Sequence, residues 1–122
     1  MTLNNNVKIE TIEKNDKFVN LKVEGKIDTL NSNEFEQKVR ESISDLTKEF
    51  EYFKFDFKDL EYLCSSGLRV LLWLKKQLEQ LTQNSKIIVE NPQKDVCDIL
   101  DTTGFSDEVV EVEYTKKGGV AK

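Results

Sequence analysis

The sequence predicts an α/β fold with a mixed β-sheet, the element order β-β-α-β-α-β-α-β, and helices mainly on one face of the sheet. Short runs alternate apolar and polar residues, as half-buried strands do, and longer runs between them carry the helical spacing of apolar residues. A short turn joins the first two alternating runs, which predicts an antiparallel hairpin. Single helices separate the later runs, which predicts parallel neighbours.

Length and composition fit one soluble domain. The chain has 122 residues, of which 34% are charged and 38% hydrophobic, a normal globular balance. We expect a single domain over 1–122, with a core over about 7–114 and a flexible tail over 115–122. The net charge of −5 argues against nucleic acid as the main partner. The longest apolar run, Val70 to Leu74, is too short to cross a bilayer. Residues 1–6 lack the features of a signal peptide, so we expect a cytoplasmic protein without a membrane partner.

The chain contains no histidine, which argues against a hydrolase or a metalloenzyme. The Ser–His and Cys–His pairs of hydrolases and the commonest metal ligand are therefore missing. Cys64 and Cys97 have no metal-type spacing, and they fit small buried residues in a reducing compartment. We expect a protein that is not an enzyme and that needs no cofactor and no metal.

The predicted hairpin is the first structural unit along the chain. Residues 7–13 form its first strand, Asn15-Asp16 supplies the turn, and residues 19–27 form its second strand. The second strand alternates strictly between apolar and polar side chains, so one of its faces should be buried.

The first helix has a clear predicted start. Asn31 is placed as N-cap, Glu34 completes a capping box, and Leu30 packs on Phe35 as a hydrophobic staple. The apolar stripe of this helix should face the sheet, and it consists of Phe35, Val39, Ile43 and Leu46.

The third strand and the second helix enclose a serine-rich turn. Residues 53–57 alternate, with Phe53, Phe55 and Phe57 inward and Lys54, Asp56 and Lys58 outward. A long helical pattern runs from Leu68 to Leu81, with a core stripe made of Val70, Leu71, Leu74, Leu78 and Leu81. Leu72 lies off this stripe and Trp73 lies nearly opposite it. Trp73 therefore belongs either to a contact surface or to a site partly buried under a neighbouring element.

The C-terminal third predicts a strand, a helix and a last strand. Residues 85–90 form a short buried strand, and Asn91-Pro92 is placed as N-cap and first residue of a helix. The inward side chains of this helix are expected to be Val96, Ile99 and Leu100. Gly104 is expected to end this helix, and Phe105 to fold back onto the core. Val110, Val112 and Tyr114 alternate in the last strand.

Two loops should meet at one edge of the sheet. Asp28 follows the second strand, and Ser65-Ser66 follows the third. If these strands are parallel, both loops emerge at their carboxyl ends, where open α/β folds place sites. A serine at a helix start is ordinarily an N-cap, and the free N–H groups there also suit an anion.

Three segments resemble STAS domains, in particular bacterial anti-sigma-factor antagonists. Gly25-Lys26-Ile27-Asp28 is similar to the family's Gly-x-x-Asp at the end of the second strand. Residues 53–57, followed by Leu60 and Leu63, resemble the third strand and its exit. Ser65-Ser66-Gly67-Leu68 resembles the signature loop. In element order the similarity extends over residues 7 to 114.

The resemblance implies a phosphorylation switch. The second serine of the loop is phosphorylated in that family, so Ser66 is the implied acceptor and Ser65 the alternative. The protein would bind an anti-sigma factor that is a serine kinase, be phosphorylated by it and released, and be reset by a serine phosphatase. The expected partner-binding residues are Asp28, Ser65, Ser66, Gly67, Leu68, Leu72 and Trp73. Cys64 stands where antagonists usually carry an aspartate.

Two alternatives stay open. The first is an interaction or adaptor module of the same fold without the switch, which Cys64 favours. The second is a small-molecule sensor or an enzyme that uses the strand ends. The absence of histidine, of a glycine-rich phosphate loop and of a metal cluster makes this second alternative the least favoured.

Overall fold

The computed structural model describes residues 7–115 and contains a six-stranded mixed sheet with four helices. The predicted flexible tail, apart from Thr115, lies outside the described residues. The elements are β1 Val7–Lys14, β2 Phe18–Ile27, α1 Ser32–Ile43, β3 Tyr52–Asp56, β4 Leu60–Leu63, α2 Ser65–Leu81, β5 Lys86–Glu90, α3 Lys94–Thr102, α4 Phe105–Glu108 and β6 Glu111–Glu113. The α/β fold class is confirmed.

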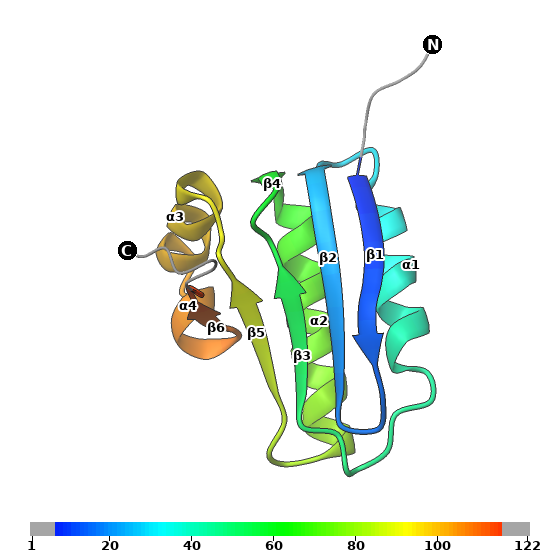
Figure 1. Ribbon diagram of the computed structural model, residues 1–122. Helices are drawn as coiled ribbons and strands as arrows, with labels where there is room; N and C mark the ends of the chain where they lie inside the picture. The colour runs from blue at the N-terminus through cyan, green and yellow to red at the C-terminus, as the bar shows by residue number, and fades with distance from the viewer. Residues whose placement is uncertain (1–6, 116–122) are drawn as a thin grey trace.

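The strand order is β1-β2-β3-β5-β6, with β4 beside β2. β1 and β2 form the predicted antiparallel hairpin, and every other pairing is parallel. Helices α1 and α2 run behind the β1–β3 part of the sheet, while α3 and α4 lie at its β5 end (Figure 1). Within residues 7–115, no helix combines the length and the apolar character that crossing a membrane requires.

The core lies between the sheet and the helices α1 and α2. The alternating strands contribute side chains that water does not reach: Val19, Leu21, Val23, Phe53 and Phe55. Phe57 follows β3 and is equally buried, so three phenylalanines form a row whose neighbouring ring centroids lie 4.9 and 5.4 Å apart. The helices complete the core with Phe35, Val39, Leu71, Leu74 and Leu78. The predicted stripes of both helices are therefore confirmed in their central residues.

Asn31 is the N-cap residue of α1, as predicted, but the predicted side-chain contacts at this helix start are wrong. The Asn31 side chain makes no capping hydrogen bond. Its oxygen accepts from the Asp28 N–H at 2.9 Å, and its amide donates to the Lys26 carbonyl at 2.8 Å. Leu30 is 80% exposed, so no hydrophobic staple forms. Leu46 lies beyond the end of α1 but still packs on the core.

The C-terminal third also departs from prediction. α3 begins at Lys94 with Gln93 as N-cap, because Asn91 takes a left-handed backbone with φ 55° and so turns the chain before a helix can begin. Two short elements, β4 and α4, are unpredicted. Gly104 does follow the end of α3 with φ 81°, and Phe105 packs on the core as expected. Val110 and Tyr114 flank β6 rather than lie in it.

Candidate functional site

A split in β2 brings the two predicted loops together. The first part of β2 pairs with β3, and its last part pairs with β4, where Ile27 lies opposite Leu63. The change occurs at Gly25, whose φ of 96° suits glycine. The Cys64 N–H then donates to the Ile27 carbonyl at 2.9 Å. The loop that starts with Asp28 and the helix that starts with Ser65 consequently leave the sheet side by side.

Asp28 holds the turn that enters α1. Its carboxylate oxygen accepts from the N–H groups of Leu30 at 2.9 Å and Asn31 at 3.1 Å. Its carbonyl accepts from the Ser32 N–H at 2.9 Å. These bonds give the half-buried Asp28 a structural role in the turn, so its side chain is already positioned before any partner arrives.

The serines lie inside the first turn of α2 rather than at its cap. Cys64 is the N-cap residue, and its side chain makes no capping hydrogen bond. Ser65 is exposed and Ser66 is half-buried. The expectation that either serine caps the helix is therefore wrong. The first backbone N–H groups of a helix have no hydrogen-bond partner within the helix. Cys64 is only 7% exposed, so it is a small buried residue, as predicted.

Gly67 and Leu68 anchor this turn to the sheet. A Cβ atom on Gly67 would lie 2.6 Å from Cδ1 of Leu63 and 3.0 Å from Cγ2 of Ile27, closer than side chains normally approach. Leu68 is only 8% exposed and belongs to the core. Gly67 and Leu68 therefore face the interior, and their partner-binding role stays a prediction that burial does not favour.

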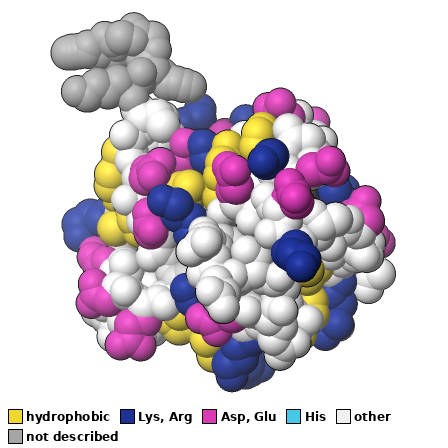
Figure 2. All heavy atoms as spheres, turned by 90° about the horizontal axis from the view of Figure 1, so that it is seen from below, with side chains coloured by type: hydrophobic (Ala, Val, Ile, Leu, Met, Phe, Trp, Pro, Cys, Tyr) yellow, Lys and Arg dark blue, Asp and Glu magenta, His cyan; other side chains and the backbone are white. Residues whose placement is uncertain are grey.

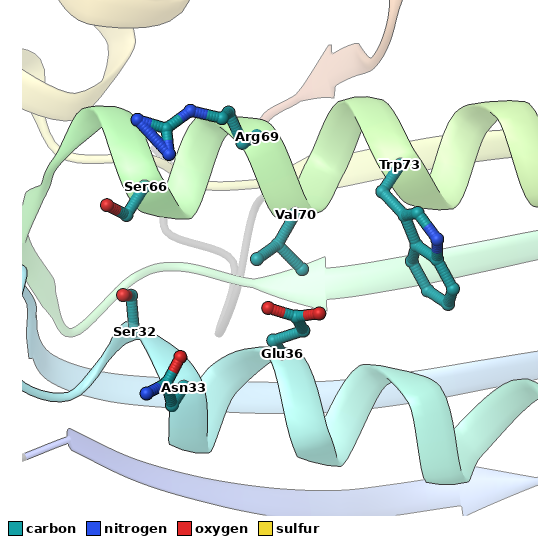
Figure 3. A pocket seen from close by; sticks show the side chains of 7 residues that line it. All are labelled: Ser32, Asn33, Glu36, Ser66, Arg69, Val70 and Trp73. Carbon is teal, nitrogen blue, oxygen red and sulfur yellow. The ribbon is translucent and has the colours of Figure 1, made fainter.

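A cleft of about 280 Å³ separates the first turns of α1 and α2. Ser66, Arg69, Val70 and Trp73 line it from α2, as Figure 3 shows. The lining residues from α1 are Ser32, Asn33 and Glu36. Ser66 thus lines a hollow of mixed character together with apolar, acidic and basic side chains.

Trp73 forms the far end of this cleft. Its ring is half-buried and is covered by the guanidinium of Arg40, 4.2 Å from the ring centroid. Arg40 is held in turn by Glu36, with an N–O distance of 2.8 Å. Trp73 is thus partly buried under a neighbouring element, and its role in partner binding stays a prediction. Leu72, 37% exposed, points away from the core, as predicted.

Asp28 opens onto a different hollow. This wider groove, about 830 Å³, is lined by Lys26, Asp28, Glu61, Tyr62, Gln93 and Asp95. Asp28 and Ser66 therefore share one edge of the sheet but line separate depressions. The sequence analysis did not predict the α1 side of the Ser66 cleft, because Ser32, Asn33 and Glu36 lie on a different helix far from the serine motif in the chain.

The part of the chain that the structure describes offers no metal site. Within residues 7–115, no group of three or more histidine, cysteine or carboxylate side chains could hold a metal ion. On the face that carries the β1–β2 turn, basic and acidic side chains are interspersed (Figure 2).

Comparisons with known proteins agree with the fold. The model of the STAS domain family matches residues 10–118. The structure is similar to that of the anti-sigma factor antagonist SpoIIAA in its unphosphorylated form, with a TM-score of 0.72 and 16% identity over 96% of this chain and 100% of that one. It is also similar to an anti-sigma factor antagonist from Mycobacterium paratuberculosis, with a TM-score of 0.70 and 18% identity over 93% of this chain and 90% of that one.

These findings confirm the resemblance that the sequence motifs indicated. At such low identities the two structures demonstrate a shared fold. The family model spans most of the chain, including β2, the serine segment and α2. The chain therefore belongs to the STAS domain family.

Proposed function

We propose that this protein is an anti-sigma-factor antagonist. In this proposal it is a non-enzymatic cytoplasmic regulator that binds an anti-sigma factor with serine kinase activity. Phosphorylation of Ser66 by that kinase ends the binding, and a serine phosphatase restores it. Two solved structures of the same fold carry the name of anti-sigma factor antagonist, which supports this choice among the roles of STAS domains.

The observation that carries the proposal is the setting of Ser66. Its neighbours Cys64, Gly67 and Leu68 are buried and fix the turn, while Ser66 itself is half-buried and lines an open cleft. The buried neighbours thus hold the Ser66 hydroxyl, the proposed phosphate acceptor, in a fixed position. A phosphate adds a charge of about −1.5 to −2, and a helix start tolerates negative charge. Phosphorylation should therefore change the surface and leave the fold intact.

The proposed contact surface follows from what remains accessible. It comprises Asp28, Ser65, Ser66, Leu72 and Trp73, and it excludes the buried Gly67 and Leu68. A partner that covers this surface would lie over the cleft and the first turns of α2. A phosphate on Ser66 would then stand inside the interface, where burying its charge is costly.

The experiment is phosphorylation by the anti-sigma serine kinase of the same organism. The purified protein is incubated with the kinase and ATP, and its intact mass is measured. One added phosphate is expected on the wild type and on Ser65→Ala, and none on Ser66→Ala. A phosphate that persists on Ser66→Ala would overturn the site assignment.

The effect on binding needs a matched pair of variants. Ser66→Asp should weaken binding to the kinase, whereas Ser66→Asn, of similar size but uncharged, should weaken it much less. The far-UV circular dichroism of both variants should equal that of the wild type. Equal binding by the two variants would remove charge as the basis of the switch.

One observation favours a second candidate function. Cys64 occupies the N-cap of α2 without a capping hydrogen bond, where the family's antagonists usually carry an aspartate. An adaptor with the same fold and no phosphorylation switch would tolerate this change. Stable binding to a partner that never phosphorylates the wild-type protein would support the adaptor.

A further inference from the structure

Arg69 lies where it can reach a group attached to Ser66. The two residues are three positions apart on α2 and line the same cleft. Residues at this spacing are neighbours on a helix surface, with Cβ atoms about 5–6 Å apart. Helical side chains also lean toward the N-terminus. Figure 3 shows the Arg69 side chain running back over the turn that carries Ser66.

Arg69 is also uncommitted, unlike the other arginine of the chain. Arg40 is engaged by the carboxylate of Glu36 at 2.8 Å and by the ring of Trp73 at 4.2 Å. Arg69 is exposed and forms no ion pair with any residue between 7 and 115. Its guanidinium can therefore take an anion without first breaking another interaction.

The cleft's own carboxylate favours one direction for a phosphate. Glu36 lies on the α1 side of the cleft, and its carboxylate would repel a phosphate in the same cleft. A phosphate on Ser66 would turn from Glu36 toward Arg69 on its own helix. Arginine suits the task because its planar guanidinium matches phosphate oxygens with two parallel hydrogen bonds.

We propose that Arg69 binds the phosphate of phosphorylated Ser66 within the same chain. This inference rests on the proposed function, since it assumes that Ser66 is modified. It adds a positioning residue to the switch: in the unmodified protein Arg69 offers a free positive charge beside Ser66. In the phosphorylated protein that charge is occupied, so a partner loses a cationic contact and meets an anion in one step.

The test installs phosphoserine at position 66 during translation, so that no kinase is needed. The second pKa of a phosphoserine phosphate lies near 6 in the absence of partners. Titration by phosphorus NMR should give a midpoint that is lower by about 0.3–0.7 pH units with Arg69 present than in Arg69→Gln. Lys76→Gln removes an exposed charge seven residues further along α2 and should leave the midpoint unchanged. Arg69→Lys should recover part of the shift.

The outcomes test the pairing of Arg69 with the phosphate separately from the proposed function. Equal midpoints in the wild type and Arg69→Gln would overturn the inference, as would an equal change in Lys76→Gln. High salt should shrink the difference, because exposed charge pairs are screened. If the shift appears but the kinase never modifies Ser66, the proposed function fails while the pairing stands. If the kinase modifies Ser66 but no shift appears, only the pairing fails.

Discussion

Replacing Gly67 by alanine tests whether the serine turn is held by close packing. The added methyl carbon would lie 2.6 Å from Cδ1 of Leu63 and 3.0 Å from Cγ2 of Ile27. Carbon atoms in contact normally lie about 3.5–4.0 Å apart, so Leu63 must retreat by roughly 1 Å. Leu63 and Ile27 are 1% and 0% exposed, and the surrounding core leaves them little room to move.

Two opposing terms set the size of the effect. Overpacking of a core typically costs about 1–3 kcal/mol. Alanine is favoured over glycine inside a helix by about 0.5–1 kcal/mol. The difference predicts that Gly67→Ala destabilises the protein by about 0.5–2 kcal/mol. A freely exposed helical glycine would show the opposite sign, since only the second term would act.

Urea unfolding measures this difference directly. Trp73 is the only tryptophan of the chain, so its fluorescence follows the unfolding of α2 without further labels. With a denaturant slope of about 2 kcal/mol per molar, the midpoint should fall by roughly 0.3–1 M. Ser65→Ala, an exposed change in the same turn, serves as the control and should stay within about 0.5 kcal/mol of the wild type.

A stabilised Gly67→Ala protein would refute the close-packing argument. The double variant Gly67→Ala/Leu63→Val gives a second check, because valine lacks the methyl carbon that the new Cβ atom would meet. Its loss of stability should be smaller than the sum of the two single losses by at least about 0.5 kcal/mol. Strict additivity would mean that the two side chains do not compete for space.

Three further predictions concern the surroundings of the site. Asn31→Ala removes the amide that ties the turn between β2 and α1. It should lower the free energy of unfolding, measured in urea, by about 2–3 kcal/mol. A loss below about 0.5 kcal/mol, the size of ordinary surface effects, would contradict this. Arg40→Ala uncovers the ring of Trp73 and should move its emission to longer wavelength, with a stability loss of about 0.5–1 kcal/mol; unchanged emission would contradict the stacking. The Tyr114 hydroxyl donates to Sγ of Cys97, which together with partial burial and nearby negative charge raises its pKa to about 12. The stability from this bond is complete below pH 10 and is lost as the pH rises through 12. A spectrophotometric titration should show a tyrosine that ionises near pH 12, and Tyr114→Phe should remove that step.

Strict periodicity made most of the fold predictable. β2 and β3 alternate so regularly that their buried faces were identified residue by residue. β4 was not predicted, because only its two end residues are buried and its four residues show no alternation of apolar and polar side chains. Its existence depends on the distant strand β2, which a local pattern cannot show.

Helix starts were the weakest part of the prediction, and for a shared physical reason. Asparagine and serine side chains can bond to several nearby backbone groups, and tertiary contacts select among them. Asn31 bonds back toward β2, and the amide of Asn91 donates to the Thr115 hydroxyl. The serine motif was placed correctly in the chain, but its cleft depends on α1, which the motif does not encode.

The split of β2 has a consequence for local opening. The ladder to β4 contains three residue pairs with an irregularity among them, whereas the ladder to β3 contains five regular pairs. Short ladders open more often than long ones, and hydrogen exchange reports such openings separately from global unfolding. We expect β4 amides to exchange ahead of those in β3. An enzyme that draws the serine segment into its own active site would then have to part only the short ladder, and the rest of the sheet would stay closed.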